Sequence, residues 1–290
     1  MSKKVLRKER KERLNELNGK AWTKYSISVW NIIKTPQERK LKHPAMFPKE
    51  LVERLIEIFT KKGDSVLDPF MGSGTTILGA RDLGRKGIGF EISEEYIDLL
   101  KKRLENPIPP RSIITKLIET ESDLTEIEYI KPDIYQEDAR NLHRFISPKS
   151  IDFVITSPPY WDILRQKRTS DYKESRPYTE SESDLGNISS YNEFLCSLQS
   201  IFKNVHTVLK EGKWCIIIVM DIRKLDKFYP FHSHVAEKMT DIGFKFEDII
   251  IWDRGREYNN LRPLGYPYVF RVNKIHEYIL FFSKEAKKTD

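Results

Sequence analysis

Residues 65–76 read SVLDPFMGSGTT, and the secondary structure that they predict indicates the fold class. The short apolar run at residues 65–70 predicts a buried strand, and the apolar spacing over residues 75–83 predicts a helix. Between them, Gly72 and Gly74 let the backbone turn tightly and approach a ligand, because glycine has no Cβ. A strand, a glycine-rich turn and a helix in this order begin a βαβ unit.

Strand and helix signals alternate over the rest of the chain. Further strands are expected at residues 87–91, 133–137, 151–156, 214–220, 246–252 and 277–282. Helices are expected at residues 48–61, after Ser93, at 191–209 and at 232–242. This order predicts an α/β fold with a doubly wound, mostly parallel sheet of seven strands. For the last two strands, which have no clear helix between them, an antiparallel pair at one edge is the alternative. Ligands of such folds bind at the carboxyl ends of the strands.

A carboxylate at the end of the second predicted strand points to a nucleoside cofactor. Glu91 follows Gly74 by 17 residues, and a carboxylate there suits the two hydroxyls of a ribose. No Gly-Lys-Ser/Thr follows the glycines, and the GSG turn lacks the spacing of a dinucleotide fingerprint. A cofactor without a pyrophosphate fits better, and S-adenosylmethionine is the obvious candidate. The alternative is a packing turn beside a surface glutamate.

A second motif, TSPPYW at residues 156–161, directly follows the strand predicted at 151–156. Pro158 and Pro159 fix φ and remove two N–H donors, so the carbonyl groups of this loop, including that of Ser157, are held rigidly. Such an acceptor suits an exocyclic amine, and Tyr160 is placed to stack on a flat ring. The alternative is a rigid loop exit whose aromatic residue packs against the protein.

The basic excess of the chain lies in its N-terminal segment. The chain has 290 residues and a net charge of +7, and residues 1–42 hold 13 lysines and arginines against four acidic residues. A basic arm of this kind is typical of nucleic-acid contacts, and a solvated helix is the alternative. We therefore expect a basic arm or helix at residues 1–42 and a catalytic domain at residues 43–290.

Composition excludes several other classes of protein. Hydrophobic residues make up 39% and charged residues 32%, which indicates a soluble globular protein. No apolar run reaches bilayer length and no secretory signal is visible, so a cytoplasmic location without a membrane partner is expected. Cys196 and Cys215 are expected to be reduced thiols, and the lone pair His232 and His234 is expected to start a helix, so no metal site is predicted.

Two further segments combine basic and aromatic residues. Residues 161–190 and 253–274 are expected to be insertions that contact DNA, because such mixtures suit phosphate contacts and stacking on an unpaired base. For the second segment, the alternative is an edge hairpin whose aromatic residues pack inward. The basic residues expected to bind substrate are Arg165, Lys167, Arg168, Arg254, Arg256 and Arg262.

Together, DPFMGSGTT and TSPPYW resemble the motifs of the amino-group DNA methyltransferases, which are the N4-cytosine and N6-adenine enzymes. The resemblance covers residues 43–283 and includes HPAMFP at 43–48, DLGN at 184–187, LKEG at 209–212 and HEY at 276–278. It implies the Rossmann-like fold of class I methyltransferases and S-adenosylmethionine as the cofactor. The cofactor-binding residues that it implies are Phe47, Asp68, Phe70, Gly72, Ser73, Gly74, Thr75, Glu91 and Asp138.

Within that resemblance, single residues take particular roles. Asp68 is expected near the methionine part of the cofactor, Glu91 at the ribose and Asp138 near the adenine. Ser157, Pro158, Pro159 and Tyr160 are the implied catalytic residues, and Trp161 is expected to help to hold the base.

The activity implied is methyl transfer to the exocyclic N4 amine of a cytosine in double-stranded DNA, with the target base flipped out of the helix. Serine as the first residue of the catalytic motif is more typical of N4-cytosine enzymes, and N6-adenine methylation is the alternative. Further alternatives are an RNA or tRNA base methyltransferase and a non-catalytic nucleic-acid-binding module. A cognate restriction endonuclease is a candidate partner, in a prokaryotic or phage-encoded system. No segment has the length of a large recognition domain, so DNA contact is expected from the three basic segments.

Overall fold

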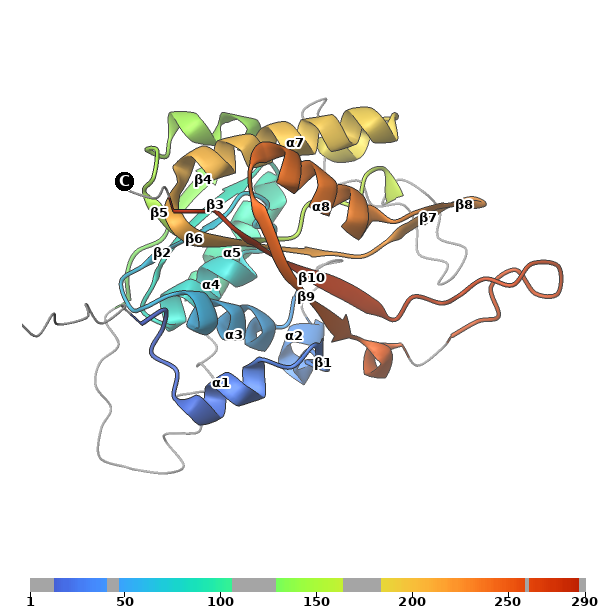
Figure 1. The fold of residues 1–290 in the computed structure, drawn as a ribbon, viewed down its shortest axis with the longest axis horizontal. Helices are drawn as coiled ribbons and strands as arrows, with labels where there is room; N and C mark the ends of the chain where they lie inside the picture. Colours follow the sequence, from blue (N-terminus) through green and yellow to red (C-terminus); the bar gives the residue numbers. More distant parts are fainter. Residues whose placement is uncertain (1–12, 41–46, 106–128, 164–183, 259–260, 287–290) are drawn as a thin grey trace, which may run out of the picture.

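The computed structural model describes residues 13–40, 47–105, 129–163, 184–258 and 261–286 (Figure 1). The strands within these ranges are β1 (Val29–Trp30), β2 (Ser65–Asp68), β3 (Lys86–Glu91), β4 (Asp133–Gln136), β5 (Ile151–Thr156), β6 (Leu209–Val219), β7 (Ile222–Lys224), β8 (Lys227–Tyr229), β9 (Lys245–Asp253) and β10 (His276–Ser283). One sheet has the order β1-β9-β10-β6-β5-β2-β3-β4, and β7 and β8 form a separate antiparallel hairpin.

The strand order reverses between β2 and β5, which is the switch point of a doubly wound sheet. The chain lays β3 and β4 on one side of β2 and then places β5 on the other side, and these neighbours all pair in parallel. The carboxyl ends of β2, β3 and β5 therefore meet at one edge, where ligands of such folds bind. The α/β doubly wound fold predicted from the sequence is confirmed.

For the last two long strands, the antiparallel alternative is the arrangement observed. β10 lies between β6 and β9 and runs antiparallel to both, so its first residues, His276 and Glu277, lie at the same edge as the carboxyl end of β6. The predicted number of seven strands is corrected to eight for the main sheet. The additional strand, β1, has two residues and pairs with β9.

Helices cover both faces of the sheet (Figure 1). They are α1 (Gly19–Tyr25), α2 (Pro36–Lys40), α3 (Lys49–Phe59), α4 (Thr75–Asp82), α5 (Glu94–Glu105), α7 (Tyr191–Val208), α8 (Phe231–Ile242) and the 3-10 helices η1 (Ala139–Arg144), η3 (Leu185–Asn187) and η4 (Gly255–Glu257). α3 and α4 pack together on one face, and α7, α8 and η1 pack on the other.

The apolar run in β6 explains why the sheet is buried on both sides. Ile216 and Ile218 belong to the core beneath α3, whereas Cys215 and Ile217 belong to the core beneath α7. Alternate side chains of a strand point to opposite faces, so a continuous apolar run fits a central strand with two covered faces. This prediction is confirmed, and the observed strand begins earlier, at Leu209.

Residues 13–40 pack against the body of the protein. The Asn15 side-chain amide donates to the carbonyl of Ile58 at 2.6 Å, and Trp30 is buried in the core beneath α3. The indole of Trp252 donates to the carbonyl of Ile32 at 2.8 Å. A shared hydrophobic core thus extends across the domain boundary expected after residue 42. Among the described residues, no helix has the length and apolar character needed to cross a membrane.

Candidate active site

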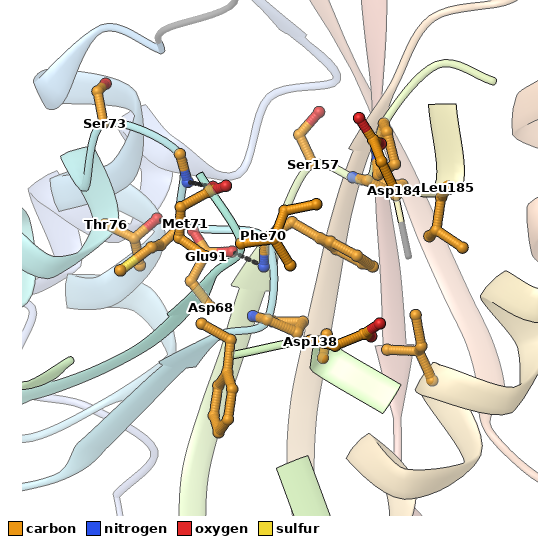
Figure 2. Close-up of a pocket in the computed structure, with 18 of the residues that line it drawn as sticks. Asp68, Phe70, Met71, Ser73, Thr76, Glu91, Asp138, Ser157, Asp184 and Leu185 are labelled. Carbon is orange, nitrogen blue, oxygen red and sulfur yellow. Dashed lines mark hydrogen bonds between the residues drawn. The ribbon is translucent and has the colours of Figure 1, made fainter. Parts of the chain in front are cut away.

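A pocket of about 920 Å³, counted with its open mouth, lies at the carboxyl ends of the central strands (Figure 2). Its walls come from the β2–α4 turn, the end of β3, the start of η1, the loop after β5, and η3. The predicted site residues that line it are Phe47, Asp68, Phe70, Gly72, Ser73, Thr75, Glu91, Asp138, Ser157, Pro158, Pro159 and Tyr160. Two motifs that lie about 80 residues apart in the sequence therefore share one pocket.

Asp68 ends β2 and ties the first motif to the second. Its carboxylate accepts hydrogen bonds from the hydroxyls of Thr76 and Thr156, both at 2.6 Å, and from the backbone N–H of Phe70 at 3.0 Å. Burial raises the pKa of this carboxyl to about 6, against the three hydrogen bonds, which lower it. Asp68 thus joins the end of β5 to the turn that begins α4.

Glu91 ends β3, and its carboxylate binds the backbone of the glycine-rich turn. One carboxylate oxygen accepts from the N–H of Gly72 at 2.9 Å and the other accepts from the N–H of Ser93 at 2.8 Å. Gly72 has φ +50°, a left-handed conformation in which a side chain is unfavourable. Burial raises the pKa of Glu91 to about 7. The turn and the acid predicted to act together are in direct contact.

Gly74 differs from Gly72 in what it contacts. It precedes α4 with φ +77°, and a Cβ on it would lie 2.3 Å from a methyl carbon of Leu100 in α5. Gly74 does not line the pocket, so its place in the motif is explained by helix packing. Next to it, the Arg103 guanidinium donates to the side-chain hydroxyls of Ser73 at 3.2 Å and Thr75 at 3.3 Å.

Asp138 lies at the start of η1, across the pocket from the turn (Figure 2). Its carboxylate caps η1 by accepting from the N–H of Arg140 at 2.8 Å, and it forms an ion pair with the guanidinium of the same residue at 2.5 Å. Elsewhere in the lining, Phe47 packs edge-on against Trp252 with ring centroids 6.0 Å apart. Both Asp138 and Phe47 line the pocket, as predicted.

The catalytic loop predicted at residues 157–160 leaves the carboxyl end of β5. Its Tyr160 hydroxyl donates to Oε2 of Glu277 at 3.1 Å, and its ring meets Phe231 edge-on with centroids 6.2 Å apart. Burial raises the pKa of the Tyr160 phenol well above its ordinary value, and the charge of Glu277 raises it further. The phenol therefore stays neutral, and its hydroxyl donates a hydrogen bond to Glu277.

Glu277 is itself held by an ion-pair network. Its carboxylate pairs with the guanidinium of Arg254, which also donates to Oε2 of Glu257 at 2.8 Å. The other oxygen of Glu257 accepts from the backbone N–H of Lys34 at 3.2 Å. The network thus runs from residues near the N-terminus to the hydroxyl of Tyr160. Arg254, which the sequence suggested as a DNA contact, lies within it and also covers the ring of Trp252.

Comparison with known proteins identifies the family. A family model described as DNA methylase, for N6 and N4 enzymes, matches residues 2–102 and 151–290. The chain belongs to this family. The resemblance found in the two sequence motifs is therefore confirmed. Methyl transfer is the chemistry of this family.

Curated relatives match this chain over shorter stretches. The Type II methyltransferase M2.DpnII of Streptococcus pneumoniae is 43% identical over 94 residues, which are 32% of this chain and 34% of that protein. The Type II methyltransferase M.BglI of Bacillus subtilis is 40% identical over 115 residues, or 39% of this chain and 32% of that protein. The chain thus spans about a third of the length of these relatives.

Among solved structures, a SAM-dependent methyltransferase from Methanosarcina mazei is 15% identical, with a TM-score of 0.48. The match covers 80% of this chain and 98% of that one.

Trp161 occupies a different place from the one expected of a base-stacking residue. Its backbone is left-handed, with φ +50°, and only 5% of the residue is exposed. The indole N–H donates to the carbonyl of Ile188 at 2.8 Å, and the ring meets that of Tyr191 edge-on. Lys224 places its ammonium 3.9 Å from the ring centroid. Because Trp161 does not line the pocket, the structure gives it a packing role at the end of the catalytic loop.

The other predicted substrate residues are Arg165, Lys167, Arg168, Arg256 and Arg262. Arg256 and Arg262 lie on the segment after β9 and do not line the pocket. Arg165, Lys167 and Arg168 lie outside the described residues.

Asp184 and Leu185 line the pocket but were not among the predicted site residues (Figure 2). Asp184 is buried, and its carboxylate caps η3 by accepting from the N–H of Gly186 at 2.8 Å. The DLGN segment that contains them was recognised as a landmark of the resemblance, and an Asp-x-Gly turn after a polar stretch was the signal that could have placed it at the site.

Proposed function

We propose that this chain transfers a methyl group from S-adenosylmethionine to the exocyclic N4 amine of a cytosine in double-stranded DNA. One observation carries the proposal: the turn held by Glu91 and the loop at Ser157–Tyr160 open into the same pocket. A cofactor held at the first would lie beside a base held at the second. Transfer between two bound groups depends mainly on such positioning, because the barrier falls when the reacting atoms are held in line.

The charges of the pocket favour a cationic cofactor without phosphate. Among the described residues, its lining includes five carboxylic acids and no lysine, arginine or histidine. The acids are Asp68, Glu91, Glu137, Asp138 and Asp184. Anionic phosphates would be repelled there, whereas the sulfonium and ammonium of S-adenosylmethionine would be attracted. The donor set therefore fits this cofactor.

When bound, S-adenosylmethionine supplies a methyl group that its sulfonium already activates. Glu91 would accept hydrogen bonds from the ribose hydroxyls, and Asp138, which lines the same pocket, would accept from the adenine amine. The Asp68 carboxylate accepts three hydrogen bonds from the protein itself, so we assign to it the positioning of both motifs rather than a contact to the cofactor. Phe70, Ile92 and Leu185 supply apolar walls.

The amine would be held by the rigid loop after β5. The Ser157 hydroxyl and the Pro158 carbonyl are acceptors for an exocyclic N–H, and the ring of Tyr160 offers a stacking surface for the base. An amine inside a duplex is out of reach, so the base has to leave the stack. The reaction needs no covalent attack by a thiol. Consistent with this, neither Cys196 nor Cys215 lines the pocket, and burial raises the pKa of Cys215.

The test is transfer of labelled methyl from S-adenosylmethionine to mixed-sequence duplex DNA, followed by mass spectrometry of the nucleosides. N4-methylcytosine is the expected product. N6-methyladenine would overturn the choice of base and keep the chemistry, and label in tRNA instead of DNA would overturn the DNA substrate. Ser157→Ala should lose most of the activity, whereas the matched variant Ser147→Ala, on the exposed surface, should retain it.

A further inference from the structure

A hairpin that the sequence did not predict projects from the edge of the sheet that carries the pocket. β7 begins shortly after β6 ends, and β6 is the neighbour of the strand that carries the catalytic loop. Figure 1 shows the β7–β8 hairpin and residues 261–274 extending on the same side of the molecule, beyond the helical layers. We define the hairpin surface as residues 222–229 and 261–274.

Direct contacts hold the two parts of the hairpin surface together. The guanidinium of Arg271 donates to the carbonyl of Leu225 at 3.2 Å, in the hairpin turn. Lys274 donates to the carbonyl of Asp221 at 3.0 Å, and its ammonium lies 4.6 Å from the ring centroid of Phe228. These two segments, which are far apart in the sequence, therefore form one surface.

The hairpin surface also contacts the end of the catalytic loop. Lys224 forms an ion pair with Asp162 and lies over the ring of Trp161. These two residues directly follow Tyr160. A macromolecule seated on the hairpin surface would therefore lie beside the loop that is proposed to hold the target base.

The charge of the hairpin surface is almost entirely positive. Its only acidic residue is Asp226, whose backbone carbonyl accepts from Arg223. Its basic residues are Arg223, Lys224, Lys227, Arg262, Arg271 and Lys274. This contrasts with the carboxylates of the pocket, so the two regions suit ligands of opposite charge. Guanidinium and ammonium groups on a projecting surface bind the phosphates of a nucleic acid.

Large apolar side chains on the hairpin surface are exposed to an unusual degree. Phe270 is 94% exposed, Tyr268 91%, Leu225 80% and Tyr266 77%. An exposed group of apolar side chains among basic residues marks a binding surface, because such side chains are normally buried. Flat aromatic rings suit the faces of bases that are no longer stacked on a neighbour.

We propose that the hairpin surface binds the duplex DNA that flanks the target base. The inference rests on the proposed function, because it names the surface that presents the DNA to the pocket. Its basic side chains contact the phosphates, and its exposed rings contact bases that are unstacked when the target base leaves the helix.

The experiment measures binding of a fluorescent mixed-sequence duplex by anisotropy over a range of salt concentrations. The triple variant Arg223→Gln, Lys227→Gln, Arg271→Gln should bind at least about tenfold more weakly, and the slope of log K against log [salt] should become shallower by about 0.9 for each phosphate that the variant no longer binds. The control triple variant Lys62→Gln, Lys131→Gln, Lys203→Gln changes the net charge equally at exposed sites elsewhere and should bind as the wild type does.

A second variant tests the apolar part. Tyr268→Ala with Phe270→Ala removes two almost fully exposed rings, so loss of the fold is not expected. Weaker binding to duplex DNA with unchanged binding of S-adenosylmethionine would support the inference. Wild-type affinity and salt slope in both hairpin variants, with methyl transfer to DNA intact, would overturn the inference alone. A wild-type protein that neither binds nor methylates duplex DNA would overturn the proposed function and the inference with it.

Discussion

Tyr160 makes two separable contributions at the scale of single residues. Its ring is the proposed surface for the base, and its hydroxyl anchors the loop to Glu277. Tyr160→Ala removes both, and methyl transfer should fall roughly 10- to 100-fold, because stacking of one base on an aromatic ring is worth about 1–3 kcal/mol. Tyr160→Phe removes only the hydrogen bond and should lose less than about tenfold. Single-turnover transfer to duplex DNA measures both losses. Equal losses in the two variants would assign the effect to the hydroxyl and contradict the role of the ring.

The raised pKa of Glu91 predicts how stability depends on pH. The pKa is about 7 in the folded protein and 4.5 for an ordinary glutamate, so between these values the folded state holds a proton that the unfolded chain has released. This group therefore contributes stability fully below about pH 4.5, and the contribution is lost as the pH rises through 7. Glu91→Gln cannot titrate, and its free energy of unfolding relative to wild type should rise by on the order of 2 kcal/mol between about pH 4.5 and 8.

Urea unfolding of both proteins at several pH values measures this difference. The loss of a hydrogen bond to Gly72 or Ser93 shifts the variant by an amount that is independent of pH, so only the change of the difference with pH is diagnostic. Free energies of the two proteins that stay parallel across this range of pH would refute the pKa shift.

The position of a site residue could be predicted from the sequence where it follows from the end of a strand. It could not be predicted where it depends on a side-chain partner that is distant in the sequence. Glu91 and Ser157 lie at the ends of predicted strands, so their place at the sheet edge could be inferred from the chain order. Arg254 pairs with Glu257, three residues away, and also with Glu277, 23 residues away on a neighbouring antiparallel strand. A basic residue in an aromatic segment has the same sequence pattern whether it faces DNA or an internal carboxylate, so only the tertiary structure distinguishes the two.

At the scale of elements, we expect one methyl group added at Gly74, in the turn before α4, to lower the free energy of unfolding substantially. Gly74→Ala combines a left-handed backbone with a clash against Leu100 in α5. Gly63 also has a positive φ, +86°, but its Cβ would meet nothing within 4 Å, so Gly63→Ala isolates the backbone cost. Gly74→Ala should destabilise the protein by roughly 1–3 kcal/mol more than Gly63→Ala, as expected for an overpacked core.

A double-mutant cycle checks this explanation. In the Gly74→Ala background, Leu100→Ala should cost less in urea unfolding than it does in the wild type, because it removes the clashing methyl groups. Additive effects of the two substitutions would mean that the clash is relieved elsewhere, and would contradict the packing role of Gly74.

The long helices and strands could be predicted because their buried residues recur at regular spacings, which leaves a clear pattern of apolar residues in the sequence. β5 was predicted with its observed bounds, and α7 differs by one residue from the prediction. The missed strands β1, β7 and β8 have two or three residues each, which is too short for a period of two to appear. They form because neighbouring segments offer backbone partners, such as β9 for β1. The hairpin surface was therefore invisible in the sequence as a unit.

At the scale of the whole molecule, the distribution of charge predicts a second contribution to DNA binding. Residues 1–12 lie outside the described residues, so this prediction rests on sequence alone. Replacing Lys3, Lys4, Arg7, Lys8, Arg10 and Lys11 by glutamine should weaken binding to duplex DNA and reduce its salt dependence. Anisotropy titrations measure the effect, and combination with the hairpin triple variant should give additive losses of binding free energy if the two regions contact separate phosphates. Unchanged binding would identify the segment as merely solvated.

The reversal of strand order between β2 and β5 has a practical consequence. All described strands that carry the glycine-rich turn and Glu91 precede residue 105, and those that carry Ser157, Tyr160 and Glu277 follow residue 129. A chain cut between these two positions leaves each described strand whole but gives neither fragment both motifs. Fused to two proteins that associate, such halves would, under the proposed function, form a complementation reporter whose output is a methyl mark written on DNA, a record that outlasts the encounter that produced it.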